Sequence, residues 1–168
     1  ININNISKVK YKIFPTPRLI IASSNFSIGE GAIEVSDSEL EIILNISQVL
    51  NFKEINYKKL LIKEGYSKIN LNKINQLFKN IDNNKKKLTF KKNNLIFLEN
   101  EKVFFEINDA LVKINQVKEK KELNINGYFL KNKVFIKFNK SSNDKNNLIF
   151  KIPKLDIATK IVFEKKNS

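Results

Sequence analysis

Hydrophobic and polar residues alternate with a period of two along most of the chain. In the first example, Val9, Tyr11 and Ile13 alternate with lysines until a Pro-Thr-Pro segment at 15–17 interrupts the pattern. This alternation is typical of β-strands whose two faces meet different surroundings. The sequence therefore predicts strands at 9–13, 18–26, 33–46, 53–64, 88–92, 95–98, 103–114, 123–130, 134–138, 148–152 and 155–163.

Short polar segments separate these strands, which favours hairpins. Gly29-Glu30-Gly31 has the residues of a tight turn, and turns are also expected at 93–94, 99–100, 131–132 and 141–147. The hydrophobic phase of 33–46 switches near Ser36, which predicts a bulge there. We therefore expect a mainly β fold, a twisted antiparallel β-meander that forms a curved sheet or groove.

One segment has helical spacing. Leu71, Ile74, Leu77, Phe78 and Ile81 recur every three or four residues, which predicts one principal helix at 70–81, packed on the sheet or capping one end. The length of 168 residues suits a single domain. Within it we distinguish an N-terminal part, 1–81, that carries the helix, and a C-terminal β-meander, 86–168.

Composition makes most enzyme classes improbable. The chain has no cysteine and no histidine, so it lacks thiol nucleophiles, the commonest general base and the commonest metal ligand. Asp37, Glu39 and Glu41 alternate on one predicted strand, and their spacing on one face would suit an acid–base pair or a hard cation. We interpret them instead as a solvated strand face, and we expect no catalytic residue, metal site or cofactor.

The net charge is +14, yet Arg18 is the only arginine among 31 basic residues. Abundant Lys, Asn and Ile indicate AT-rich codons, so part of this charge reflects base composition. The lysines suit a solvated exterior or attraction to an anionic membrane surface or to nucleic acid. Because nucleic-acid recognition relies on arginine side chains, nucleic acid is not an expected partner.

Several of the later strands are hydrophobic on both faces. The segments 103–107, 134–138 and 148–152 place an apolar residue at nearly every position. A sheet with one wet face should alternate more cleanly. Two explanations stay open: packing between two layers, or a concave face that meets an apolar ligand.

The order of these segments resembles the AsmA-like family across residues 9–165. The resemblance rests on Phe14-Pro15-Thr16-Pro17-Arg18-Leu19-Ile20-Ile21, on Phe26-Ser27-Ile28-Gly29, on the long strand 33–46, on Val49-Leu50-Asn51-Phe52 and, more loosely, on 123–129. It implies a non-enzymatic periplasmic β-groove protein involved in phospholipid transport and outer-membrane biogenesis. It also implies a tether to the inner membrane by an upstream helix that this chain does not contain.

The expected partners are thus phospholipid acyl chains and an anionic membrane surface. No hydrophobic run in the chain reaches the ~20 residues of a membrane span. Two alternatives stay open, a basic β-rich module that binds polyanions and a structural scaffold. For the lipid hypothesis, one face of the later strands would line the groove: Leu123, Ile125, Phe129, Val134, Ile136, Phe138, Leu148, Phe150 and Ile152.

Overall fold

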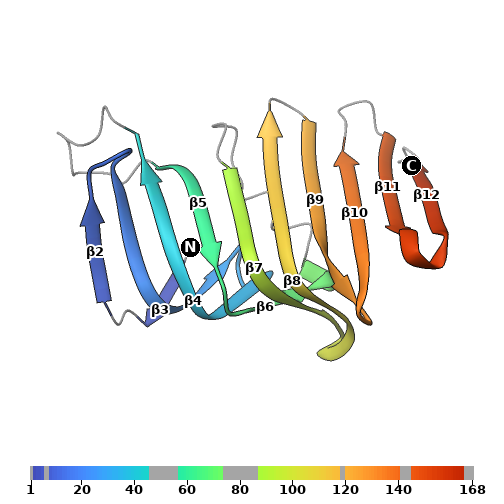
Figure 1. Cartoon of the computed structure of the whole chain (residues 1–168), viewed down its shortest axis with the longest axis horizontal. Coiled ribbons are helices and arrows are strands. Elements are labelled where there is room, and N and C mark those ends of the chain that lie inside the picture. The colour runs from blue at the N-terminus through green and yellow to red at the C-terminus, as the bar shows by residue number, and fades with distance from the viewer. Residues whose placement is uncertain are drawn as a thin grey trace.

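The computed structural model is mainly β, as the sequence predicts. It describes residues 2–5, 8–45, 57–73, 87–117, 120–140 and 145–164. Within these ranges twelve strands form one large curved sheet (Figure 1). The strands are β1 (Asn2–Asn5), β2 (Lys8–Lys12), β3 (Arg18–Ile28), β4 (Ile33–Leu44), β5 (Tyr57–Lys63), β6 (Tyr66–Asn70), β7 (Lys87–Glu99), β8 (Lys102–Val117), β9 (Lys120–Phe129), β10 (Asn132–Lys140), β11 (Lys145–Ile152) and β12 (Ile157–Glu164).

Most neighbours in the sequence are antiparallel neighbours in the sheet, so the meander is largely confirmed. The order is β1-β3-β4-β5-β7-β8-β9-β10-β11-β12, with β2 also on β3 and with β6 between β4 and β7. The exception is β7, which is parallel to both β5 and β6. A parallel pair needs a crossover connection, so the expectation of hairpins throughout is wrong at this step.

The predicted helix at 70–81 falls mostly outside the described residues. Asn70 is the last residue of β6, and Leu71–Lys73 form a single 3-10 turn, η2. Residues 74–81 lie outside the described ranges. Within those ranges the helical elements are η2 and a second 3-10 turn, η3 (Pro153–Leu155), and neither could cross a membrane.

A crease crosses five adjacent positions of the sheet. At each position one residue has a left-handed backbone conformation, with φ between 45° and 60°. The pairing register places these residues at nearly the same level. At that level the β3–β4, β7–β8 and β8–β9 pairings shift their register. Such bulges bend strands sharply. The crease residues are Ser23 in β3, Asp37 in β4, Glu64 between β5 and β6, Lys92 in β7 and Asp109 in β8.

The crease confirms one sequence prediction and overturns another. The bulge expected near Ser36 is present at Asp37. A turn was expected at Asn93-Asn94, but β7 runs without interruption from Lys87 to Glu99 and only bends there. Polar residues in a strand are typical of either a turn or a bulge, and here neighbours on both sides keep the strand paired.

Buried polar side chains hold the crease together. Ser24 Oγ donates a hydrogen bond to the Ser38 carbonyl at 3.0 Å, and Ser38 Oγ donates to the Glu64 carbonyl at 2.8 Å. Asn93 Nδ2 donates to the same Glu64 carbonyl. Bulges take backbone groups out of the ladder, and a buried carbonyl without a partner is costly. These side chains therefore replace the ladder bonds that the bend removes.

The crease divides the sheet into two limbs. The lower limb comprises β1, β6 with η2, and residues 25–36 and 94–108 of the longer strands; the upper limb comprises the remainder, including β9–β12. Side chains from both limbs form one hydrophobic cluster, which includes Phe26, Ile33 and Leu95 below and Leu40, Ile62 and Phe90 above. The core therefore lies inside the bend.

One row of cross-strand partners shows where this core ends. We call it the central row. It begins with side chains at most 5% exposed and continues with partly buried and then exposed ones. The concave face is thus sealed over the first strands and open over the last. The central row consists of Ile21, Leu40, Ile62, Phe90, Val112, Ile125, Ile136, Phe150 and Thr159.

Candidate ligand-binding groove

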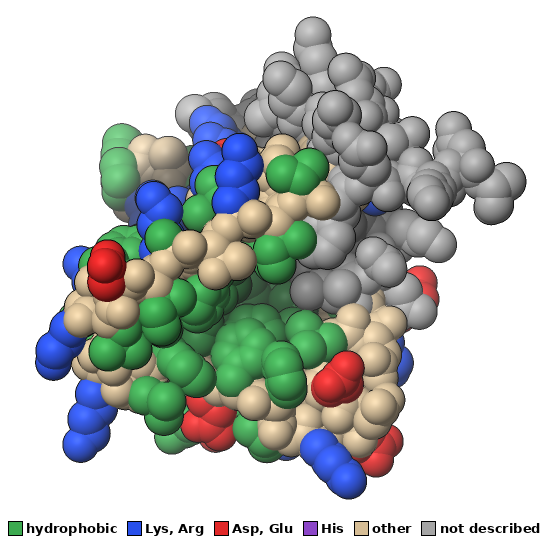
Figure 2. Space-filling model, turned by 90° about the vertical axis from the view of Figure 1, so that its right-hand side faces the viewer, with side chains coloured by type: hydrophobic (Ala, Val, Ile, Leu, Met, Phe, Trp, Pro, Cys, Tyr) green, Lys and Arg blue, Asp and Glu red, His purple; other side chains and the backbone are tan. Residues whose placement is uncertain are grey.

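A hydrophobic cavity of about 770 Å³ occupies the open part of the concave face. Figure 2 shows it as a hollow surrounded by hydrophobic side chains, with lysines at the margin of that face. All but three of its 17 lining residues are hydrophobic, and the exceptions are Lys140, Asn146 and Thr159. This volume lies within the range of small-molecule sites, about 300–1,000 Å³.

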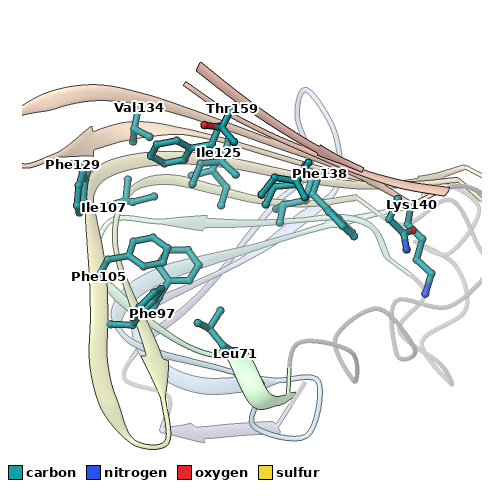
Figure 3. Close-up of a pocket in the computed structure, with 17 residues that line it drawn as sticks. Leu71, Phe97, Phe105, Ile107, Ile125, Phe129, Val134, Phe138, Lys140 and Thr159 are labelled. Carbon is teal, nitrogen blue, oxygen red and sulfur yellow. The ribbon is translucent and has the colours of Figure 1, made fainter. Parts of the chain in front are cut away.

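The two limbs of the sheet form opposite walls of this groove. Residues 102–107 of β8 extend beyond the last pairing with β9, at Asn108, and curve beneath the upper limb (Figure 3). The lower wall contains Leu71, Phe97, Phe104, Phe105 and Ile107. The upper wall, from β9–β12, contains Leu123, Ile125, Phe129, Val134, Ile136, Phe138, Lys140, Asn146, Leu148, Phe150, Thr159 and Ile161.

The residues predicted from the sequence lie together on the upper wall. The register aligns Leu123 with Phe138 and Leu148, and it aligns Ile125 with Ile136 and Phe150. Of the nine predicted residues, Ile152 is the exception. It is 3% exposed and belongs to the hydrophobic core, and the cavity lining does not include it.

Aromatic rings close one end of the groove. Phe97 and Phe105 are cross-strand partners whose rings stack at 4.2 Å. Phe129 meets the edge of Phe105 at 6.4 Å, and it thereby joins the upper wall to the lower one. Phe104 packs against Phe105 at 5.4 Å but remains 65% exposed at the rim. Packed aromatic rings therefore close this end of the groove, and the exposed Phe104 ring lies at its rim.

The other end is polar. Lys121, Lys140 and Asn146 are successive cross-strand partners on β9, β10 and β11, and therefore share one face of the sheet. Figure 3 shows Lys140 far from Phe97, Phe105 and Phe129. Burial and the neighbouring charge of Lys140 lower the pKa of Lys121 below its usual 10.5. The groove thus runs from an aromatic end to a positively charged end.

The two glutamates of β4, Glu39 and Glu41, both form ion pairs. Arg18 Nη1 lies 2.6 Å from Glu41, and Lys63 Nζ lies 2.8 Å from Glu41 and 2.9 Å from Glu39. Burial alone would raise the pKa of Glu41, but the bonds from Lys63 and Arg18 outweigh it and leave that pKa below 4.5. Glu41 is therefore a neutralised structural carboxylate.

Asp37 differs from the two glutamates. Its left-handed conformation places it on the crease, exposed, with its backbone N–H bonded to Asn25 Oδ1 at 3.1 Å. The interpretation of a solvated strand face holds for the exposed Asp37 but is wrong for Glu41, which is buried against its two cations. In the described part of the chain, no group of three or more His, Cys, Asp or Glu side chains could hold a metal ion.

Sequence reasoning missed the lower wall of the groove and its polar end. Phe97, Phe104 and Phe105 lie in strands that were recognised, but nothing in the alternation shows that these strands bend back toward β9–β12. Gly127 supplied a signal, since an isolated glycine in a strand often marks a close approach of backbones. A Cβ atom at Gly127 would collide with Ile107 and the Asn108 carbonyl, where β8 crosses the end of β9.

Comparison of this chain with protein-family models, with curated proteins and with solved structures finds no match. The AsmA-like resemblance therefore stays a hypothesis.

Proposed function

We propose that this chain is a non-enzymatic lipid-binding β-groove, in which the acyl chain of a phospholipid or related lipid lies along the concave face. The observation that carries the proposal is the hydrophobic cavity between the two limbs, open over β9–β12. Each methylene moved from water into such a site contributes about 0.8 kcal/mol. An acyl chain therefore gains affinity from length alone, without any catalytic group.

The shape of the groove supports a chain-like ligand. Its walls are continuous hydrophobic rows, for example Leu123, Phe138 and Leu148, rather than one deep pocket with several polar anchors. Sites for compact polar substrates place convergent polar groups around the ligand. Here the polar lining residues are few, and Lys140 and Asn146 lie at one end.

The AsmA-like resemblance extends this proposal to phospholipid transport in the periplasm. In that setting the groove would be one segment of a path that shields acyl chains between the inner and outer membranes. The periplasmic location and the membrane tether rest on the resemblance of residues 9–165 alone.

The proposal is tested by lipid binding of a matched pair of variants. Phe150 lines the groove on β11, whereas Phe135 lies on the opposite face of β10. We expect Phe150→Glu to reduce binding of a fluorescent fatty acid, and co-purification of lipid, at least tenfold, because a charge would enter the hydrophobic wall. Phe135→Glu should leave binding unchanged. Circular dichroism monitors folding of both variants.

Two outcomes would contradict the lipid-binding proposal. One is a folded wild-type protein that binds neither fatty acid nor phospholipid. The other is an equal loss of binding in the folded Phe150→Glu and Phe135→Glu variants.

A further inference from the structure

We propose that the polar end of the groove is an anion site, formed by Lys140 and Asn146 with Lys121 beside them, that binds the carboxylate or phosphate headgroup of the lipid. This inference rests on the proposed function, because it specifies which end of the lipid lies where. The headgroup would lie at the Lys140 end, and the hydrocarbon chain would point toward Phe105 and Phe129.

The first argument is the placement of two like charges. Lys121 and Lys140 are direct cross-strand partners, so their Cβ atoms are about 5 Å apart. Like charges in that position destabilise a sheet. An anion bound at Lys140 would reduce this repulsion, because the Lys140 ammonium would then form a charge-assisted hydrogen bond. In the described part of the chain, no ion pair joins Lys140 to a carboxylate.

The second argument is a buried amide that points to a ligand. Asn146 is the cross-strand partner of Lys140 and lines the same cavity. Its Oδ1 is buried and has no hydrogen-bond partner among the residues that the structure describes. Such atoms are rare in folded proteins and call for an explanation. Rotation of the side-chain amide exchanges its acceptor and its donor, so Nδ2 can take the position of Oδ1 and donate a hydrogen bond to a headgroup oxygen.

The third argument is the contrast between the ends. The aromatic end is closed by stacked rings and offers no charged group among the lining residues. Lys140 is exposed, so an anion beside it would stay partly hydrated. An amphipathic anion fits this arrangement in one direction only, with its chain on the rings and its head beside the lysine.

The test compares two ligands with the same chain. The probes are cis-parinaric acid, a fluorescent fatty acid, and its uncharged methyl ester. We expect wild-type protein to bind the acid about tenfold more tightly than the ester, as one charge-assisted contact would produce. Lys140→Gln should abolish this preference, and Lys140→Arg should retain it. Lys151→Gln is the matched control, because Lys151 is exposed on the opposite face of β11.

The outcomes separate this inference from the proposed function. If wild-type protein binds acid and ester equally, or if Lys140→Gln keeps the preference, the anion site is overturned while the hydrophobic groove stands. If neither probe binds, the proposed function fails. Millimolar inorganic phosphate distinguishes a lipid headgroup from a free anion as the ligand of this site. If phosphate leaves the affinity for the fatty acid unchanged, the headgroup site is supported. If phosphate lowers that affinity to the affinity for the ester, the headgroup site is overturned in favour of a free-anion site.

Discussion

At the scale of single residues, the charged side chains of β4 form ion pairs with neighbouring strands. Glu41 is 3% exposed and contacts Arg18 and Lys63, which are 19% and 35% exposed. A buried carboxylate is tolerated because both cations lie within hydrogen-bonding distance. Of the 31 basic residues, the single arginine makes the shortest ion pair described, at 2.6 Å. Glu41 on β4 thus links β4 to β3 through Arg18 and to β5 through Lys63.

This network predicts how stability depends on pH. Because the pKa of Glu41 in the folded protein lies below 4.5, its contribution is fully present above 4.5 and is lost as the pH falls through the folded value. Glu41→Gln should lower the free energy of unfolding at neutral pH by about 1–2 kcal/mol. The difference from wild type should shrink at acid pH, where the wild-type carboxyl is also protonated. Urea unfolding across pH measures both quantities.

Glu34→Gln is the control for this prediction, since Glu34 is exposed on the same strand. It should change stability little at any pH. A difference between wild type and Glu41→Gln that stays constant into the acid range would contradict the network.

At the scale of elements, the crease determines where strands begin, bend and end. β5 and β6 follow one another along the same position in the sheet, between β4 and β7, and are separated at Glu64-Gly65. This break lies at the crease, at the same height in the sheet as the bends in β7 and β8. Gly65 has φ +77°, and a Cβ atom there would overlap the Ser36 and Asp37 backbone and the Ser38 side chain. The element boundary therefore depends on one residue without a side chain.

Two glycines with the same backbone conformation test this role. Gly31 has φ +80°, but a Cβ atom there would meet only Lys73 Nζ at 3.7 Å. Gly31→Ala should cost about 1 kcal/mol, the strain of the left-handed conformation. Gly65→Ala should cost about 3 kcal/mol or more, because the new methyl group also displaces the Asp37 bulge. Chemical unfolding compares the two, and equal losses would show that the crease tolerates a side chain.

At the scale of the whole molecule, one concave face serves both as core and as groove. Along the central row, Ile62 is fully buried whereas Ile136 is partly exposed and lines the cavity. The difference arises from the lower limb, which packs against the first strands, whereas the cavity separates much of it from β9–β12 and Phe105 contacts Phe129 at one end. Open hydrophobic surface of this kind is typical of ligand-binding and interaction sites, in agreement with the lipid-binding groove that we propose.

A pair of substitutions in the central row tests this division. Ile62→Ala should lower the free energy of unfolding by about 2–5 kcal/mol, because it leaves a cavity in a sealed core. Ile136→Ala should cost clearly less, since the groove already exposes that side chain, and it should weaken fatty-acid binding instead. Urea unfolding and a binding titration give the two readouts. Equal destabilisation would show that Ile136 is ordinary core.

The sequence alone determined most of the strands, though not β1 or β6, together with most of their order and most of the upper wall of the groove. Those features depend on local alternation, which is visible whenever neighbouring residues meet different surroundings. It therefore placed Leu123, Ile125 and Phe150 on one face before any fold was known. It also located the turn at Gly29-Glu30-Gly31, where all three residues have positive φ.

Only the tertiary structure decided that β7 lies parallel to β5 and β6, and that five adjacent positions bend at one level. Both features depend on strands that are far apart in the sequence, so the alternation within one strand does not predict which strands pair or whether their bends align. The bend brings Phe97 and Phe105 opposite β9–β12, and the register sets Lys140 beside Lys121 and Asn146. A groove with two different ends is a property of that long-range arrangement, because each end combines residues that only the folded sheet brings together.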